Sequence, residues 1–415
     1  MKTPLVFALA GLALGLGSCS KDLTCAADET NVDGTCYALQ SDSSNCGTRG
    51  HACSADRGCS RGTCVDCTSA GTACLPAVVA TCYNLNQVRP LGENLAPAAA
   101  PIATDSGPIK FASLNGKLYA ANSTASSISA ITLTPPSATT GSGAIAVPSG
   151  SAGFGDLEYL SAHGGLLWAS NAAAGTLVAI DPAKGVIEEI ALPLPAHGST
   201  NPQGIDFVGT TGYLALQGLN ALAVLDLSTV PGGKVTQLID LTSLSSNGAN
   251  AAPTRVLAVG SRVYVTLNNL FDAKYAPVAG AYGRLAVVDA TSNTLKGGAL
   301  DLGSSCLDAG GLALSGTTLW VACGYFNWLG GANAVTGAAF VPVDLASGAP
   351  VVGNAITLSN AATNIVFCKG RGYAGASNSG TVLAFDPASR AVTSMLACPP
   401  AAGKASYVPD VTCAP

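Results

Sequence analysis

Residues that could carry catalytic chemistry are scarce in this sequence of 415 residues. Only three histidines are present (His51, His163 and His197), and neither an H-E-x-x-H zinc motif nor a G-x-S-x-G nucleophile elbow occurs. Residues 370–375 satisfy G-x-G-x-x-G, but they lie in a predicted hairpin with no following helix to bind a pyrophosphate. The sequence therefore predicts no catalytic residue and favours a protein that is not an enzyme.

Cysteine is the other residue type with metal-binding or redox chemistry. Nine of the 15 cysteines fall between Cys25 and Cys82. Cys64 and Cys67 have the C-x-x-C spacing of zinc ligands or redox enzymes, and His51 could be a further ligand. The surrounding segment, however, has too few large apolar residues to form a core, so disulfides must hold it. We therefore predict a small disulfide-rich module over residues 19–82, formed in an oxidising compartment.

The first 18 residues have the pattern of a signal peptide, with Lys2 followed by an apolar run too short to span a bilayer. The run ends in Leu16-Gly17-Ser18-Cys19, which resembles the lipobox of bacterial lipoproteins. The resemblance implies cleavage before Cys19, a lipid anchor on that cysteine, and sorting to the outer membrane, because serine follows it in place of aspartate. The cysteine-rich segment is likewise similar to the stalks of bacterial surface lipoproteins. The alternative is a soluble secreted protein in which Cys19 forms a disulfide.

Composition limits the partners of the mature chain. Charged residues make up 10% of the sequence, the net charge is -5, and lysine and arginine do not cluster. Such a surface exerts little long-range attraction on a polyanion, which argues against nucleic acid as a partner. Beyond residue 18, no uncharged apolar run approaches the ~20 residues that a membrane span needs.

An aromatic residue recurs about every 50 residues beyond residue 107, each time after a glycine-containing turn. A short apolar run precedes each turn, and a later apolar run usually ends in aspartate, whose carboxylate can accept backbone N–H groups in a turn. Each unit therefore predicts four short antiparallel strands. The six aromatics are Tyr119, Trp168, Tyr213, Tyr264, Trp320 and Tyr373, and the aspartates are Asp181, Asp226, Asp289, Asp344 and Asp386.

These units resemble the YVTN class of β-propellers, whose blades carry an aromatic-small-small-Asn second strand and a third strand ending in aspartate. Residues 119–122 and 168–171 match the pattern best. The resemblance implies an all-β fold, a β-propeller of six, alternatively seven, four-stranded blades over residues 108–415. A Pro/Ala-rich linker over residues 83–107 would join it to the disulfide-rich module. A seventh blade could be assembled only from this linker and residues 404–413.

The loops that enter the innermost strands of a propeller surround the mouth of its central channel. At this place the sequence puts polar residues, which either hydrate the entrance or bind a ligand. Some propeller lactonases bind a divalent cation here, so the resemblance implies Ca²⁺ or Mg²⁺ and a metal-dependent hydrolase as the alternative function. The main expectation requires no cofactor. The residues concerned are Asp156, Glu158, Asp206, Arg255, Asp308 and Asn364.

The fourth and fifth units each carry about a dozen extra residues between their second and third strands. Both loops would lie beside the channel mouth, and together they contain six aromatics, which with nearby amides suit sugar rings or a peptide partner. The sequence thus predicts a cell-surface or periplasm-facing lipoprotein that acts as a binding or scaffold protein for a protein or carbohydrate ligand, with this face as the binding site. The alternative is that the loops pack on each other as a small satellite core. The aromatics are Phe271, Tyr275, Tyr282, Tyr325, Phe326 and Trp328.

Cysteine parity restricts the disulfides. Residues 25–82 supply nine cysteines and the propeller five, so complete oxidation requires an odd number of bridges between the two groups. Cys306 precedes the first strand of the fifth unit and Cys323 ends the second, so we predict that these two pair. For the bridge between the groups we favour Cys82 with Cys413, which would fasten the two ends of the propeller.

Overall fold

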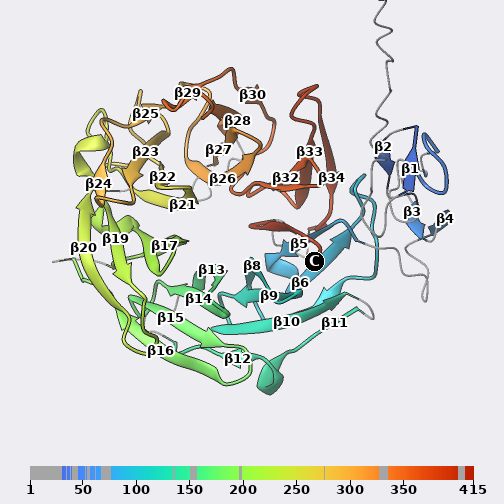
Figure 1. Ribbon diagram of the computed structural model, residues 1–415, viewed down its shortest axis with the longest axis horizontal. Coiled ribbons are helices and arrows are strands. Elements are labelled where there is room, and N and C mark those ends of the chain that lie inside the picture. Colours follow the sequence, from blue (N-terminus) through green and yellow to red (C-terminus); the bar gives the residue numbers. More distant parts are fainter. Residues whose placement is uncertain are drawn as a thin grey trace, which may run out of the picture.

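The computed structural model describes residues 30–66 with gaps at 34, 38, 40–44, 52, 54–56 and 61, and residues 76–415 apart from 134–135, 150–156, 196–198, 275, 327–334 and 401–406. Seven antiparallel sheets stand around a common centre, so the fold is an all-β propeller (Figure 1). Within the described ranges, no helix is long and apolar enough to cross a membrane.

The first three blades follow one another along the chain, each from its innermost to its outermost strand. Blade 1 contains β8 (Pro108–Leu114), β9 (Lys117–Asn122), β10 (Ser127–Leu133) and an interrupted outer strand, β11 (Pro136–Ala138) and β12 (Ile145–Ala146), with η2 (Gly141–Gly143) between its pieces. Blade 2 contains β13 (Leu157–His163), β14 (Leu166–Asn171), β15 (Thr176–Asp181) and β16 (Gly185–Ala191). Blade 3 contains β17 (Pro202–Val208), β18 (Thr211–Leu216), η3 (Gln217–Leu219), β19 (Ala221–Asp226) and β20 (Lys234–Asp240).

Blades 4 to 6 repeat this order. Blade 4, preceded by η4 (Thr242–Leu244), contains β21 (Pro253–Val259), β22 (Arg262–Leu267), β23 (Arg284–Asp289) and the outer pieces β24 (Thr294–Leu295) and β25 (Leu300–Asp301). Blade 5 contains β26 (Ala309–Ser315), β27 (Thr318–Phe326), β28 (Val335–Asp344), β29 (Val351–Val352) and β30 (Ile356–Thr357). Blade 6 contains β31 (Val366–Cys368), β32 (Arg371–Gly375), β33 (Thr381–Phe385) and β34 (Val392–Leu396).

A seventh blade closes the ring and corrects the preferred count of six. Its strand order is β35-β5-β6-β7, so the innermost strand comes from the C-terminal end of the chain and the other three come from the N-terminal side. The strands are β35 (Val411–Cys413), β5 (Val78–Cys82), β6 (Gln87–Leu91) and β7 (Ile102–Ala103), with η1 (Tyr83–Leu85) between β5 and β6. Residues 83–107 are therefore part of a blade and not a linker, and the expected boundary after Cys82 falls at the end of β5.

The aromatic residue that recurs in each unit of the sequence is explained by side-chain packing. All six repeated aromatics are buried, with at most 5% of each side chain exposed, and they pack between neighbouring blades, where the core clusters lie. The repeated aspartates each accept a backbone N–H from two residues ahead, at 2.7–3.0 Å. The carboxylates thus stabilise the turn after the third strand, as the sequence predicts.

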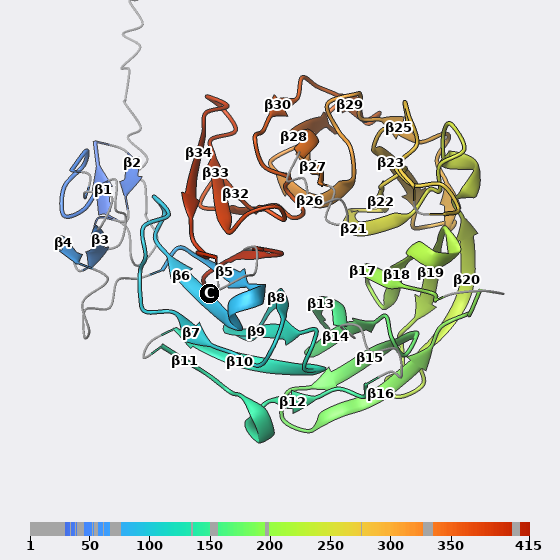
Figure 2. The same ribbon diagram turned by 180° about the vertical axis from the view of Figure 1, so that it is seen from behind.

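The described part of the N-terminal module contains two hairpins beside the ring, visible from both sides in Figures 1 and 2. These pair β1 (Thr30–Val32) with β2 (Thr35–Tyr37), and β3 (Arg57–Ser60) with β4 (Thr63–Asp66). Disulfides join Cys46 to Cys59 and Cys53 to Cys64. Cys64 of the C-x-x-C pair is therefore bonded to a cysteine outside that motif, which supports the structural interpretation of this segment.

Disulfides in the propeller confirm one predicted pair and overturn the other. Cys306 is bonded to Cys323, as predicted, whereas Cys82 is bonded to Cys398 and Cys413 to Cys368. The favoured Cys82–Cys413 bridge is wrong because of strand register. β35 runs antiparallel to β5 with Cys413 opposite Val78, which places Cys413 four residues, or roughly 13 Å, along the strand from Cys82.

Candidate functional site

A polar cavity of about 400 Å³ lies at one end of the central channel. Every blade contributes to its wall, and each of blades 1 to 5 contributes at least one residue from a β-bulge near the start of its innermost strand. A bulge inserts an unpaired residue and redirects its side chain. The bulge residues that line the cavity are Ile109, Glu158, Gln203, Thr254, Arg255 and Gly310.

In several blades the residue that precedes the innermost strand has a positive φ angle. Gly107, Asn201, Ala252 and Asp308 each directly precede an innermost strand and have φ between 45° and 76°. In three of these blades the next residue is proline, whose fixed φ suits the first position of a strand. The unusual backbone of Asp308 is therefore shared with equivalent positions of the fold. Its place in this turn directs its carboxyl group to the cavity.

Amides, hydroxyls and one phenol make up most of the remaining cavity wall. On the side formed by blades 3 and 4, Asn201 donates a hydrogen bond to Gln217 Oε1 at 2.6 Å, and Gln203 donates one to Asn201 at 2.9 Å. Thr254 donates to the side-chain oxygen of Asn268, the first residue after β22. These contacts fix the amides while leaving further donors and acceptors for a ligand, since each amide group can make several bonds. Thr363, Tyr407 and Pro409 complete the wall from blades 6 and 7.

Two half-buried carboxyl groups, those of Glu158 and Asp308, share the cavity. Burial raises the pKa of Glu158 to about 7 and that of Asp308 to about 6, against the opposing attraction of the Arg255 guanidinium. Burial also raises the pKa of Tyr407 above its ordinary value, reinforced by the negative charges of Glu158 and Asp308. Both carboxyl groups therefore gain or lose protons near neutral pH.

Arg255 stands between the large cavity and a second cavity of about 210 Å³ deeper in the channel. Its guanidinium lies 5.0 Å from the centroid of the Tyr159 ring, and Lys110 Nζ lies 4.9 Å from the same centroid. The aromatic ring thus lies close to two cations and helps to hold both in place. Among the described residues, neither Nε nor Nη1 of Arg255 has a hydrogen-bond acceptor.

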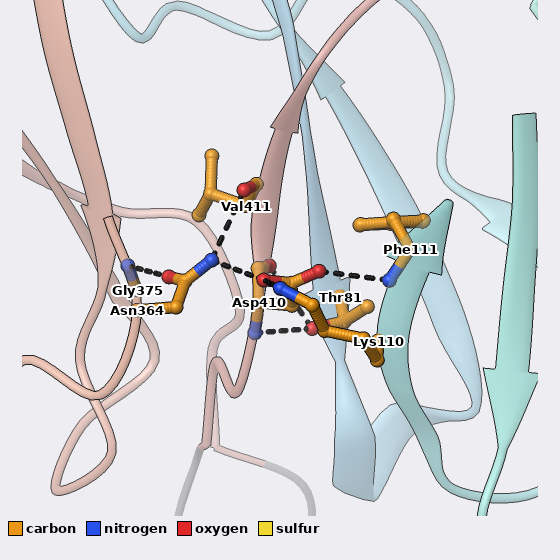
Figure 3. Close-up of polar contacts among 7 residues, drawn as sticks. All are labelled: Thr81, Lys110, Phe111, Asn364, Gly375, Asp410 and Val411. Carbon is orange, nitrogen blue, oxygen red and sulfur yellow. Dashed lines mark hydrogen bonds and ion pairs between the residues drawn. The ribbon is translucent and has the colours of Figure 1, made fainter. Parts of the chain in front are cut away.

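The second cavity borders the seam that closes the ring, where Asp410 joins three blades (Figure 3). Its side-chain carboxylate accepts hydrogen bonds from Lys110 Nζ at 2.8 Å, from the backbone N–H of Phe111 at 2.8 Å, and from Asn364 Nδ2. Its backbone N–H donates to Thr81 Oγ1 at 2.9 Å. Only 1% of the Asp410 side chain is exposed, so this ion pair is a buried structural element.

Two predicted metal ligands have structural roles. Asn364 donates to Asp410 and to the carbonyl of Val411, and its oxygen accepts the N–H of Gly375 at 3.1 Å (Figure 3). Asp206 accepts the N–H groups of Phe207 and Ala258, which fastens β17 to β21, while burial raises its pKa. Both side chains border the second cavity but are committed to protein partners.

The described part of the channel does not fit a Ca²⁺ or Mg²⁺ site. Of the expected ligands, Glu158 and Asp308 line the larger cavity together with the cation Arg255, whereas Asp206 and Asn364 line the second cavity but are bonded to protein groups. Ca²⁺ prefers six to eight oxygen ligands, usually with several carboxylates. Asp156 lies outside the described residues. Within those ranges, the one close group of three candidate ligands is Cys46, Cys53 and Cys64, all of which are disulfide-bonded.

The blade 4 insertion lies on the cavity face, because residues 246 and 250 in the loop before β21 bond to it. Phe271 and Tyr325, one from each blade, form an edge-to-face pair with 5.8 Å between ring centroids. This contact fits the alternative of a satellite core for these two residues. Tyr282 is half-buried. Tyr275, Trp328 and the side chain of Phe326 lie outside the described residues.

Several cavity residues escaped prediction, although a signal for them exists. Gln203 and Thr254 each follow a proline that opens an innermost strand, at the bulge where a side chain turns inward. A search for polar residues that directly follow a proline at the start of a predicted innermost strand would have identified both Gln203 and Thr254. Tyr407 gave no comparable signal, because it precedes the short β35 strand of the split blade.

Comparison with known proteins supports the architecture. Residues 84–251 match a family model described as "Repeat of unknown function (DUF6923)", which is less than half of the chain. No curated protein matches the sequence.

Several solved structures share the fold. A putative 6-phosphogluconolactonase from Bacteroides uniformis has a TM-score of 0.58 at 8% identity, covering 81% of this chain and 98% of its own. A protein from Lactobacillus plantarum has a TM-score of 0.58 at 12% identity, covering 81% and 99%. A catalytically inactive virginiamycin B lyase from Staphylococcus aureus, with quinupristin, has a TM-score of 0.52 at 16% identity, covering 69% and 83%. At these identities the likeness establishes the β-propeller fold alone.

Proposed function

We propose that this protein is an exported, lipid-anchored binding protein whose channel-mouth cavity takes a carbohydrate. The observation that carries the proposal is the composition of the 400 Å³ cavity, whose wall combines amides, hydroxyls and carboxyl groups with one arginine and one tyrosine. Its volume is within the range of about 300–1,000 Å³ that is usual for small-molecule sites. A ligand rich in hydroxyl groups could exchange hydrogen bonds with this wall at many points.

The amides on the blade 3 and 4 side are suited to such a ligand. Because Gln217 Oε1 and Asn268 Oδ1 already accept hydrogen bonds, their side-chain NH₂ groups remain available as donors. Asn268 also begins the blade 4 insertion, so the aromatic-bearing loop starts at the cavity wall. A sugar bound in the cavity would therefore reach the start of this loop.

Gln217 provides the most direct test of the carbohydrate site. We expect wild-type protein to bind at least one of glucose, galactose and N-acetylglucosamine in isothermal titration calorimetry. We expect Gln217→Leu to weaken that binding by about tenfold, or ~1.4 kcal/mol, through loss of amide hydrogen bonds. Gln237→Leu is the matched control. Gln237 lies on β20, the outer strand of blade 3 and away from the cavity, where its side chain donates a hydrogen bond to the carbonyl of Asn293. Equal affinities for the two variants would contradict this location of the site.

The lipid anchor rests on the lipobox-like sequence before Cys19, which lies outside the described residues. The disulfides agree with folding in an oxidising compartment. Mass spectrometry of protein purified from its native membrane is expected to find Cys19 as the first residue, with a lipid attached. An unmodified amino terminus at another residue would rule out this form of anchoring.

A metal-dependent hydrolase of the lactonase type is the second candidate. The observation in its favour is that two carboxyl groups, Glu158 and Asp308, share the cavity. The positive charge of Arg255 beside them argues against a cation. Calorimetry with Ca²⁺ and Mg²⁺ separates the candidates, since stoichiometric binding of either ion at the cavity would favour the hydrolase.

A further inference from the structure

Arg255 has hydrogen-bond donors to spare. It forms no ion pair at 4.0 Å or less with a described carboxylate, although Glu158 and Asp308 lie near enough to be attracted by it. Its Nε and Nη1 have no hydrogen-bond acceptor among the described residues, and the Tyr159 ring lies beside the guanidinium. A guanidinium with unused donors binds carboxylates well, so an anion brought into the cavity would be attracted, most strongly when Glu158 and Asp308 are neutral.

We propose that the ligand of this cavity is a sugar that carries a carboxylate, a uronic acid, whose charge is balanced by Arg255. This inference rests on the proposed carbohydrate site and adds the chemical class of the sugar. The amides of blades 3 and 4 bind its hydroxyl groups, while the carboxylate lies towards the arginine. Protonated Glu158 and Asp308 then donate hydrogen bonds to the ligand, whereas their ionised forms repel it.

The charge of the cavity reverses with pH, which makes the inference measurable. Above pH 7 both carboxyl groups are mostly ionised, so that Glu158, Asp308 and Arg255, the described charged groups of the cavity wall, together carry one net negative charge. Below pH 6 both are mostly neutral, which leaves one net positive charge. Affinity for an anion therefore rises as the pH falls through 7 and then 6.

The other ionisable groups that the structure describes near the channel do not reverse this sign. Tyr407 stays neutral over this range because its pKa is raised. Lys110 is paired with Asp410. Asp206 is held by two backbone N–H groups at the second cavity. The Tyr159 ring lies close to both Lys110 and Arg255.

The test compares sugars that differ only in the carboxylate. Calorimetry with glucuronate and glucose, and with galacturonate and galactose, is done at pH 5.5 and pH 8, with acetate as a simple anion. We expect a uronic acid to bind at least about tenfold more tightly than its neutral partner at pH 5.5, and this preference to fall about tenfold at pH 8. Arg255→Gln should abolish the preference, and Glu158→Gln should flatten its dependence on pH.

The control variant is Arg390→Gln, which removes an exposed arginine from a turn of blade 6. Circular dichroism of each variant verifies the fold. Binding of neutral and acidic sugars with equal affinity, or a preference that survives Arg255→Gln, would overturn the inference and leave the carbohydrate site standing. Acetate binding as tightly as the uronic acid would also overturn it, because a sugar would not be required. Absence of binding by any of the sugars would overturn the proposed function together with the inference.

Discussion

Replacement of Asp410 by alanine is expected to lower the free energy of unfolding by about 3–5 kcal/mol, because it leaves the largely buried Lys110 ammonium, 16% exposed, without its partner. The same substitution leaves the N–H of Phe111 and the amide of Asn364 without their acceptor. Since Phe111 belongs to blade 1 and Asn364 to blade 6, the lost hydrogen bonds are those that join blade 7 to its two neighbours where the ring closes. Urea unfolding followed by tryptophan fluorescence measures the change.

Asp344→Ala is the control for Asp410→Ala. Asp344 is exposed and accepts one backbone N–H at the turn after β28, so its loss is expected to cost about 1 kcal/mol or less. A second variant, Lys110→Met, removes the cation but keeps an apolar stem in its place. If the seam depends on charge balance, the double variant Asp410→Ala, Lys110→Met should be less destabilised than the sum of the single variants. Similar stabilities for Asp410→Ala and Asp344→Ala would contradict the role of the seam.

Blades 1 to 6 could be predicted because each is local in sequence. Tyr213 illustrates the signal, since it follows a turn, occupies the second strand and is fully buried between blades. Asp226 then marks the end of the third strand in the same unit. Such short-range patterns are repeated wherever a blade is built from one continuous segment.

The seventh blade lacks this local signal. Its innermost strand, β35, has three residues and pairs with β5 more than 300 positions away in the sequence. Its third strand, β6, contains Pro90, which weakened the pattern of a strand and favoured a linker. No repeated aromatic marks the unit. Sequence reasoning found the segments that could complete a seventh blade, but only the long-range pairing places them in one sheet.

The sequence predicted the location of the candidate site residues better than it predicted what their side chains bind. Glu158 and Asp308 do meet at the channel mouth. Asp206, by contrast, is used to bind the N–H of Ala258, 52 residues away, and Asn364 is used at the closing seam. Whether a polar side chain faces a ligand or satisfies a distant backbone group depends on contacts between blades, which residue type and spacing do not reveal.

Removal of the Cys82–Cys398 disulfide is expected to lower the free energy of unfolding by about 5 kcal/mol. The bridge closes a loop of 316 residues, and the entropy that a cross-link removes from the unfolded chain increases with loop length. The double variant Cys82→Ser, Cys398→Ser is compared with Cys306→Ser, Cys323→Ser, whose bridge closes a loop of 17 residues and should contribute only about 3 kcal/mol. The comparison is well matched because all four cysteines are buried, with at most 2% exposed, so the cost of placing serine in the core is similar. Denaturant unfolding of both variants measures the difference, and an equal or smaller loss for the Cys82–Cys398 pair would show that this bridge does not stabilise the closed ring through chain entropy.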